Sequence, residues 1–311
     1  MRTLLIVFFL LVSSLSFGQD VSLQGEPSGR EGIPYFIILG DPQIDNPPRS
    51  DVEDNYNAVR DIFRQIAKED PAFLFLLGDL VFSGEVESYW KKFDHLISPV
   101  RRKQIPAYSI LGNHEYFSYP RNMFKYFYQR FPHLEYNTFF ELGFGNCRIL
   151  ALNSNYSSLP KKEQQDQVLW YRDRLDALEK DTSVASVIIT CHHPPYSNSK
   201  EAGDDADVEM DFVNPFVLAK KTKLFVCGHS HSYEHFKVEG KDFINSGGAG
   251  PRHSLKPSVP TKQDLYKTDD NGETRPHNYL KLYPLPNGLR IEMMKLGDDG
   301  EFSVGDTVTV N

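Results

Sequence analysis

Five short apolar runs, each followed at once by side chains that can bind a metal, constrain this chain most. The runs are residues 35–39, 73–77, 107–111, 187–190 and 224–227, and each leads into the polar residues through a glycine or another small residue. Their length and boundaries are typical of strands that are buried on both faces. In α/β folds, functional groups gather outside the carboxyl ends of such strands. The pattern therefore predicts one crevice lined by residues from five distant parts of the sequence.

The side chains that follow these runs carry hard oxygen atoms or imidazole rings. They are Asp41 with Gln43, Asp79, Asn113 with His114 and Glu115, His192 with His193, and His229 with His231. His229 and His231 are separated by one residue, and in extended or loop backbone they cannot share one face as helical histidines do. Each is better placed to bind its own ion, which indicates two neighbouring metal ions rather than one.

These blocks resemble the calcineurin-like metallophosphoesterases, in which they read D-x-H, G-D, G-N-H-[DE], H and G-H-x-H. All five are present in that order between Asp41 and His231. The sequences at residues 228–234 and 245–250 are most similar to the acid-phosphatase branch. Two positions depart from the pattern: Gln43 stands where most members have histidine, and Phe82 stands where purple acid phosphatases have a tyrosine ligand. A tyrosinate-ligated iron site is therefore not expected.

Carried over residue by residue, the resemblance implies two metal ions, divalent or trivalent, that share one aspartate. The ligands would be Asp41, Gln43, Asp79 and His231 for the first ion, and Asp79, Asn113, His192 and His229 for the second. His114 would stabilise the transition state or protonate the leaving oxygen, with Asp41 orienting it. Mixed nitrogen and oxygen ligands fit Mn, Fe or Zn. The neutral amide of Gln43 predicts a weaker first site and leaves a one-metal state open.

The implied reaction is hydrolysis of a phosphoric ester by direct attack of a metal-bridging hydroxide. The leading hypothesis is a secreted or periplasmic phosphomonoesterase. A phosphodiesterase would use the same ligands, so the sequence leaves it open. A non-catalytic phosphate or metal binder is a third interpretation, supported by Gln43 alone and opposed by the presence of His114. Four neighbours of the matched positions are expected to orient ligands: Glu115, His193, Tyr233 and Glu234.

The first 18 residues have the layout of a secretory signal. Arg2 precedes an apolar stretch at residues 4–15, too short to span a bilayer comfortably, and small residues precede a cut before Gln19. An uncleaved anchor is the alternative. Removing residues 1–18 deletes one positive charge, Arg2, and no acid, so the formal charge changes from −8 to −9. This balance argues against nucleic-acid or anionic-membrane binding, but bound cations would allow a small phosphorylated substrate.

The predicted fold is α/β, a four-layer αββα sandwich of two mixed sheets flanked by helices. It is expected as a single domain at residues 33–311, after an exposed leader at 19–32. Amphipathic spacing predicts helices at 51–68, 85–97, 164–180 and 212–221, which alternate with the apolar runs. A hairpin is expected at 138–152, and terminal strands at 279–283, 289–296 and 302–310.

Several segments have two interpretations. The aromatic residues at 116–144 form a helix face with a lid, or a wall that holds the organic part of a substrate. The acidic stretch at 197–211 is a solvated loop, or it borders the pocket and disfavours strongly anionic substrates. Residues 254–275 are expected to form an exposed loop. His253, just before this loop, is expected to be a surface histidine, and the alternative is that it reaches the pocket. Cys191 and Cys227 are expected in the core, although a disulfide between them is conceivable.

Overall fold

The computed structural model describes residues 19–22, 34–45, 53–117, 124–135, 137–200, 202–252, 255, 262–267 and 275–311. The predicted signal peptide, most of the predicted leader and His253 lie outside these residues. Within the described part of the chain, no helix combines the length and the apolar character needed to cross a bilayer.

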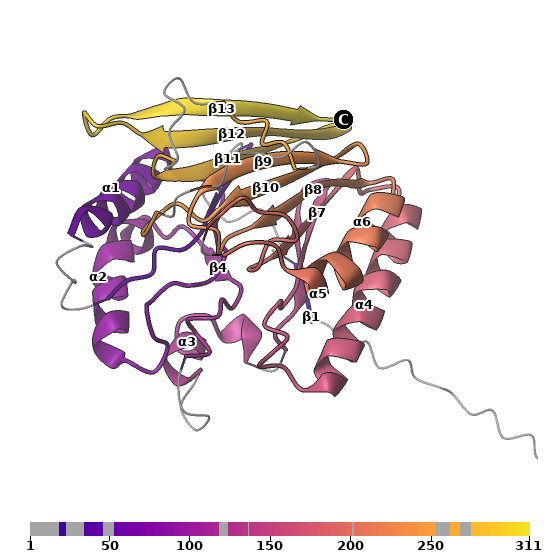
Figure 1. The fold of residues 1–311 in the computed structure, drawn as a ribbon, viewed down its shortest axis with the longest axis horizontal. Coiled ribbons are helices and arrows are strands. Elements are labelled where there is room, and N and C mark those ends of the chain that lie inside the picture. Colours follow the sequence, from indigo (N-terminus) through magenta and orange to yellow (C-terminus); the bar gives the residue numbers. More distant parts are fainter. Residues whose placement is uncertain are drawn as a thin grey trace, which may run out of the picture.

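Two mixed β-sheets pack face to face, and helices cover both outer sides (Figure 1). The six-stranded sheet has the order β13 (Phe302–Val310), β12 (Gly288–Leu296), β11 (Asn278–Leu285), β2 (Phe36–Leu39), β3 (Leu74–Leu76) and β4 (Ala107–Ser109). The seven-stranded sheet has the order β1 (Gln19–Ser22), β5 (Phe140–Phe144), β6 (Cys147–Ala151), β7 (Ser186–Cys191), β8 (Thr222–Cys227), β10 (Lys241–Ser246) and β9 (Tyr233–Val238). The predicted four-layer αββα sandwich is confirmed, as are the hairpin and the three terminal strands.

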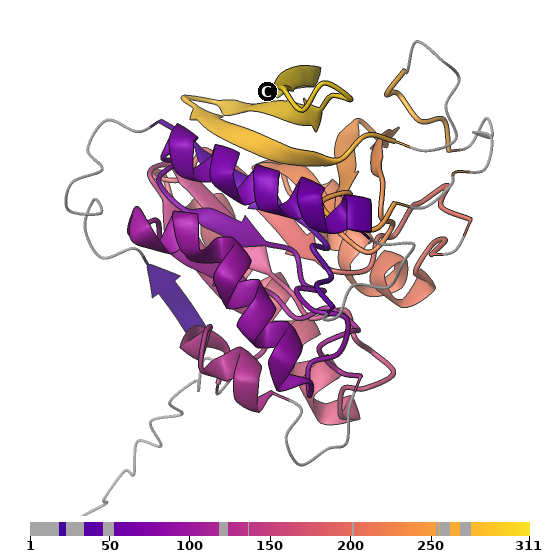
Figure 2. The same cartoon turned by 90° about the vertical axis from the view of Figure 1, so that its left-hand side faces the viewer.

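The helices form the two outer layers. Helices α1 (Glu53–Glu69) and α2 (Glu87–Arg102) lie side by side in front of the strands in Figure 2 and cover one sheet. Helix α4 (Lys161–Lys180) covers the other sheet, beside α6 (Asn214–Leu218). Within the aromatic segment, the structure has a short α3 (Lys125–Tyr128) and a 3₁₀ turn at Pro132–Leu134. Three of the four predicted helices are confirmed. Each begins within a few residues of its predicted start, and α2 continues beyond its predicted end at residue 97 to Arg102.

The fourth helix prediction, at residues 212–221, is wrong in its boundaries. Helical structure begins with α5 (Ala206–Val208), continues as a π-helical turn at Glu209–Val213 and ends with α6 at Leu218. The carboxylate of Asp205 caps the start by accepting a hydrogen bond from the N–H of Val208 at 2.9 Å. From the sequence, Asp205 belonged to an acidic stretch with two interpretations, a solvated loop or a border of the pocket. A capping aspartate within a run of acids cannot be recognised until the helix start is known.

Alternate residues of the central strands pack into two separate hydrophobic clusters. In β6, Ile149 belongs to the cluster that also contains the apolar residues of α1 and α2, whereas Leu150 belongs to the cluster that contains those of α4. In β8, Leu224 and Phe225 divide in the same way. Because both faces of these strands are covered by apolar groups, their sequences are continuously apolar rather than alternating. The prediction of strands buried on both faces is confirmed.

Cys191 and Cys227 end the neighbouring strands β7 and β8 as buried free thiols, with their sulfur atoms 3.7 Å apart. Burial raises the pKa of the Cys191 thiol well above its usual value. Since the thiolate is the reactive form of cysteine, this environment makes Cys191 a packing residue with little reactivity. The expectation of two core cysteines is confirmed.

Two segments that were predicted to be exposed contribute to the fold. Gln19–Ser22, from the expected leader, forms β1 and pairs in parallel with β5. In the expected loop at 254–275, Asp264 is buried, accepts a hydrogen bond from the N–H of His235 at 3.0 Å and forms an ion pair with Arg275 at 2.8 Å. The guanidinium of Arg275 also lies over the ring of Tyr266. A polar segment can be buried when its charges pair with one another, and sequence alone does not reveal such pairing.

Phe73 links the two sheets, so its truncation tests the sandwich. Its buried ring stacks on Phe36 at 4.6 Å and meets Phe144 of β5 edge-on at 5.5 Å. We expect Phe73→Ala to lower the free energy of unfolding by about 3–5 kcal/mol, measured by urea denaturation. Val304→Ala, at a side chain that is 51% exposed, is the control and should change it by less than about 0.5 kcal/mol. Equal effects of the two substitutions would contradict this account of the core.

Candidate metal centre

Strand ends from both sheets meet at one place. Parallel strands β2, β3 and β4 lead into Asp41, Asp79 and Asn113, and parallel strands β7 and β8 lead into the histidines. The ligand atoms of Asp41, Asp79 and His192 all lie within 4.8 Å of one another, and all three side chains are buried. The sandwich thus brings together residues as far apart in sequence as Asp41 and His229, which are separated by 188 positions.

His192 is at the middle of this cluster. Its Nδ1 lies 2.8 Å from the carbonyl oxygen of Leu77, which can only accept, so Nδ1 carries a proton. Its Nε2 faces Oδ1 of Asn113 at 3.1 Å, Nδ1 of His229 at 3.2 Å and Oδ2 of Asp79 at 3.3 Å. Among the described residues, Oδ2 of Asp79 is buried without a hydrogen-bond partner. Several electron-pair donors therefore converge on one point, which is the arrangement that a bound cation requires.

Asp41 forms the other half of the cluster. Both of its carboxylate oxygens accept hydrogen bonds from the N–H of His229, at 3.0 and 2.9 Å. Nε2 of His231 lies 3.6 Å from Oδ1 of Asp41. Gln43 is also buried, and its backbone N–H donates to the carbonyl oxygen of Asp79 at 2.8 Å. Asp79 and His231 therefore lie close to Asp41, and the backbone of Gln43 is hydrogen-bonded to that of Asp79.

The backbone at five predicted ligands lies in the left-handed region. The φ angles are 57° at Asp41, 41° at Gln43, 50° at Asp79, 62° at His229 and 49° at His231. Only eight non-glycine residues of the described chain have positive φ, so most of them are at this cluster. Such conformations are unfavourable for residues with a Cβ atom and concentrate at functional sites. The fold thus uses locally strained backbone to direct these side chains toward one another.

Two glycines of the sequence blocks leave room for the carboxylates. A Cβ atom at Gly112 would lie 2.1 Å from Oδ1 of Asp79, and one at Gly228 would lie 2.4 Å from Oδ2 of Asp41. Both distances are far shorter than any tolerable contact, so any other residue would displace the aspartate. This close approach is the physical reason for glycine before Asn113 and before His229.

Burial and mutual charge shift the pKa values of the clustered groups in opposite directions. Burial raises the pKa of Asp41 well above its usual value. Burial opposes protonation of His192, but the nearby carboxylates of Asp79 and Asp41 raise its pKa to about 10. Burial and the neighbouring His192 lower the pKa of His229 to about 2. These neighbouring groups compete for the same protons, and a bound metal cation can take the place of those protons.

His114 lies beside the cluster with a defined orientation. Its backbone N–H donates to Oδ1 of Asp79 at 2.8 Å, and its Nδ1 donates to the carbonyl oxygen of Phe82 at 2.7 Å. Its Nε2 therefore points toward the cluster and lies 3.8 Å from Oδ2 of Asp79. This nitrogen is the atom through which His114 could transfer a proton.

The four expected orienting groups divide into two pairs. The carboxylate of Glu115 accepts hydrogen bonds from the N–H groups of Asp79, Leu80 and Gly112, each at 2.8 Å, and so holds the backbone of Asp79. Burial and Asp79 raise the pKa of Glu115 to about 7. The His193 ring lies 4.3 Å from that of His229. These two residues contact the cluster or its backbone, as expected.

Tyr233 and Glu234, in contrast, support more distant parts of the fold. The hydroxyl of Tyr233 donates to Asp306 of β13 at 2.8 Å. Glu234 accepts hydrogen bonds from the hydroxyl of Ser197, the N–H of Asn198 and the amide of Asn245. Their contacts hold loops and strands in place, so proximity in sequence to His231 was a poor guide to their role.

Sequence analysis missed three polar residues that follow β6. Ser154 lies 2.8 Å from Nδ1 of His193, Asn155 donates to the carbonyl oxygen of Leu111 at 3.1 Å, and Asn153 donates to the hydroxyl of Tyr116 at 2.8 Å. They connect the His192 loop to the loop that carries Asn113. The same pattern, an apolar strand followed by polar residues, was present in the sequence and could have identified them.

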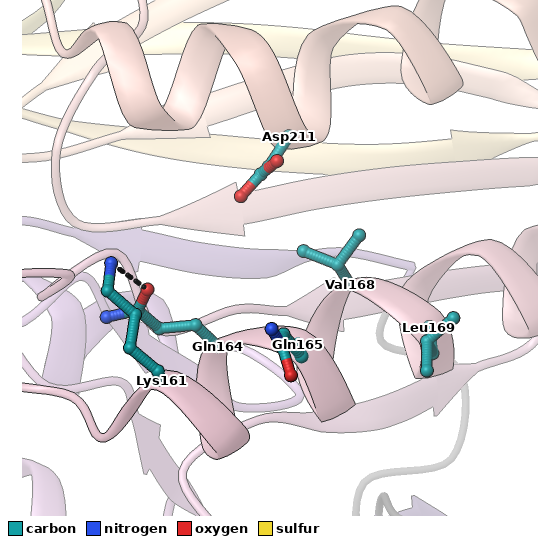
Figure 3. A pocket seen from close by; sticks show the side chains of 6 residues that line it. All are labelled: Lys161, Gln164, Gln165, Val168, Leu169 and Asp211. Carbon is teal, nitrogen blue, oxygen red and sulfur yellow. Dashed lines mark hydrogen bonds between the residues drawn. The ribbon is translucent and has the colours of Figure 1, made fainter.

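One residue of the acidic stretch, Asp211, lines a separate pocket. A cavity of about 460 Å³ lies between α4 and the turn at Glu209–Val213 (Figure 3). It is lined by Lys161, Gln164, Gln165, Val168, Leu169 and Asp211. Asp211 accepts a hydrogen bond from the hydroxyl of Tyr156 at 2.9 Å. No predicted ligand lines this cavity, so Asp211 contributes to a separate surface feature rather than to the metal cluster.

Comparison with known proteins identifies one family. A family model described as calcineurin-like phosphoesterase matches residues 34–233. No curated protein matches the chain.

Solved structures share the fold at low sequence identity. The purple acid phosphatase PPD1 from yellow lupin (Lupinus luteus) seeds has a TM-score of 0.65 and 17% identity over 88% of this chain and 53% of its own, so this chain spans about half of its length. GAP50, the anchor in the inner membrane complex of Plasmodium, has a TM-score of 0.67 and 16% identity, and the match covers 89% of this chain and 88% of GAP50. A dimetal phosphatase from Danio rerio has a TM-score of 0.61 and 12% identity, and the match covers 90% of this chain and 99% of the phosphatase. At these identities the likeness establishes the fold alone.

Substitution of Glu115 tests whether it positions the metal cluster. Glu115→Gln places an amide N–H₂ against one of three backbone donors, so we expect metal affinity to fall about tenfold or more, as for other groups that support metal ligands. Competition between the protein and a fluorescent chelator for Mn²⁺ or Zn²⁺ measures the change. Glu87→Gln, at an exposed site on α2, is the control. Unchanged affinity in Glu115→Gln would show that Asp79 is held without it.

Proposed function

The chain belongs to the calcineurin-like phosphoesterase family, and from this premise we propose that it is a metal-dependent phosphomonoesterase. The observation that carries the proposal is the convergence of Asp79, Asn113 and His229 on Nε2 of His192, with Nε2 of His114 facing the same carboxylate. This combination supplies both a metal-binding cluster and a proton donor.

The residues present fit a pair of cations. Two carboxylates, amide oxygens and imidazole nitrogens make a mixed set suited to Mn, Fe or Zn. In the proposal, Asp79 would contribute to both sites. Asp41, Gln43 and His231 would complete one site, and Asn113, His192 and His229 would complete the other. When bound, two ions would neutralise charge on the phosphoryl oxygens and make water acidic enough to act as a nucleophile near neutral pH.

The proposed role of His114 is to protonate the leaving group. A water oxygen forms a bond to phosphorus and gives up one proton to solvent while the bond from phosphorus to the ester oxygen breaks. The departing alkoxide takes a proton from His114, which regains one from solvent. The hydrogen bond from Nδ1 to Phe82 leaves Nε2 to donate that proton, since protonated imidazole carries a hydrogen on both nitrogens. The products are an alcohol and inorganic phosphate.

Two other functions use the same residues. A phosphodiesterase would need the same ligands and the same acid. A non-catalytic binder is supported by two observations: Gln43 replaces a histidine of the family pattern, and GAP50, described as an anchor, shares this fold. The orientation of His114 favours catalysis, because a binder would not need a proton donor directed at the cluster.

We further propose that the protein acts outside the cytoplasm on a small phosphorylated substrate. The support for the location is the signal-like layout of residues 1–18. The net charge of the chain is acidic, and bound cations would allow it to accept a small phosphorylated substrate. Such a charge disfavours nucleic acid and anionic membrane surfaces as partners. Detection of a mature N-terminus at Gln19 in the exported fraction would test this.

Replacement of His114 tests the proton-transfer step. His114→Ala should retain metal and lose about 10²–10⁴-fold in kcat with ethyl phosphate, whose leaving alkoxide needs a proton. The loss should be much smaller with 4-nitrophenyl phosphate, because that leaving group departs without one. His95→Ala, at an exposed histidine of α2, is the matched control. An equal loss with both esters, or none, would remove His114 from this role.

Replacement of Gln43 tests the weaker first site. Gln43→His substitutes an imidazole for a neutral amide at the first site. We therefore expect the ion at this site, the more weakly held of the two, to bind more tightly. Elemental analysis after dialysis against buffers of graded chelator strength measures the metal content per chain. Wild type should lose one equivalent at a weaker chelator than the variant does. If both proteins lose metal together, Gln43 does not limit occupancy.

A further inference from the structure

The ring of His114 contacts two phenylalanine rings. The Phe117 ring centroid is 4.5 Å from that of His114 in an edge-to-face arrangement, and the Phe82 centroid is 5.2 Å away in a tilted one. Phe82 is half-buried, whereas Phe117 is 51% exposed. Other phenylalanines of the aromatic segment, such as Phe127 and Phe131, are buried in the core. Phe117 therefore presents an apolar surface to solvent beside the proposed proton donor.

The backbone that carries Phe117 is held in place. Its N–H donates to the carbonyl oxygen of His114 at 3.3 Å, and its carbonyl oxygen accepts from the hydroxyl of Ser83 at 2.9 Å. The N–H of Gly84 donates to the same carbonyl of His114 at 3.0 Å, and a Cβ at Gly84 would lie 2.6 Å from the carbonyl oxygen of Glu115. The two loops are thus packed directly on each other. Because these contacts fix the backbone, the side chain of Phe117 is held at an exposed position.

An exposed phenylalanine is by itself ordinary, because much of any protein surface is apolar. The position of Phe117 distinguishes it. A proton donor must lie within hydrogen-bond reach of the oxygen that it protonates, so the leaving oxygen would lie next to Nε2 of His114. The organic group bonded to that oxygen would then lie within a few ångströms of the Phe117 ring. Aromatic rings at such separations, about 4.5–7 Å between centroids, attract one another in stacked or edge-on geometries.

We propose that Phe117 is a specificity-determining residue that binds the aromatic part of the leaving group, so that the preferred substrates are phosphomonoesters of aromatic alcohols. The ring of Phe82 packs against that of His114 and adds apolar surface beside it. The inference rests on the proposed function, since it requires an ester whose leaving oxygen reaches His114. It adds the class of alcohol, which neither the metal ligands nor the proton donor determines.

The test compares two esters of primary alcohols with similar leaving-group basicity, benzyl phosphate and ethyl phosphate, on the metal-loaded full chain. Phe117→Ala should lower kcat/KM about tenfold for benzyl phosphate, the size expected for loss of an aromatic contact and its buried area. The value for ethyl phosphate should change less than about twofold. Phe117→Trp retains an aromatic surface and should preserve the preference for the benzyl ester. Val304→Ala, at an equally exposed apolar residue on β13, should alter neither value.

The outcomes separate this inference from the proposed function. A selective loss with benzyl phosphate that Phe117→Trp restores supports it. Equal losses with both esters mean that Phe117 acts by supporting His114, which overturns the inference but leaves the phosphatase intact. No effect on either ester also overturns it. If wild type hydrolyses neither ester, the proposed function itself fails and the inference fails with it.

Discussion

Two buried carboxylates, Asp41 and Asp79, at the junction of two sheets are the constraint on which the rest of this structure depends. Ionised carboxylates removed from water lose several kcal/mol of hydration unless they are compensated. Here His192 and backbone N–H groups compensate them partly, and the remaining electron pairs converge where cations could bind. The glycines before Asn113 and His229 make room for these carboxylates. The left-handed backbone of the ligands directs the side chains toward them.

Such a cluster needs a rigid support. Local strain of about 1–3 kcal/mol at each left-handed residue persists only when the surrounding structure over-determines it. The support consists of strands whose two faces are both covered by apolar groups, so that each strand end is fixed from two sides. The buried Glu115 adds three hydrogen bonds to the backbone around Asp79. The stability of the core thus offsets the backbone strain at the cluster.

The fold itself does not decide the chemistry. A purple acid phosphatase, a dimetal phosphatase and a protein described as an anchor share it with this chain at 17% identity or less. Function must therefore be argued from individual side chains. In this chain Gln43 stands where most of the family has histidine, and Phe82, whose ring packs against that of His114, stands where purple acid phosphatases have a tyrosine. Phe82 offers no oxygen ligand from its side chain, and its ring and backbone carbonyl oxygen both contact the imidazole of His114.

The sequence by itself determined the sandwich class, most strands and helices, and which residues gather at the cluster, because apolar periodicity and the Gly-Asp, Gly-Asn-His and Gly-His-x-His blocks are local signals. It did not determine the boundaries of the helix after Asp205, the burial of Asp264 with Arg275, or the contacts of Tyr233 and Glu234. Those features depend on partners far away in the chain, and a polar side chain has the same identity whether or not such a partner is present. Only the tertiary structure decided that Phe117 is exposed beside His114 while its aromatic neighbours fill the core.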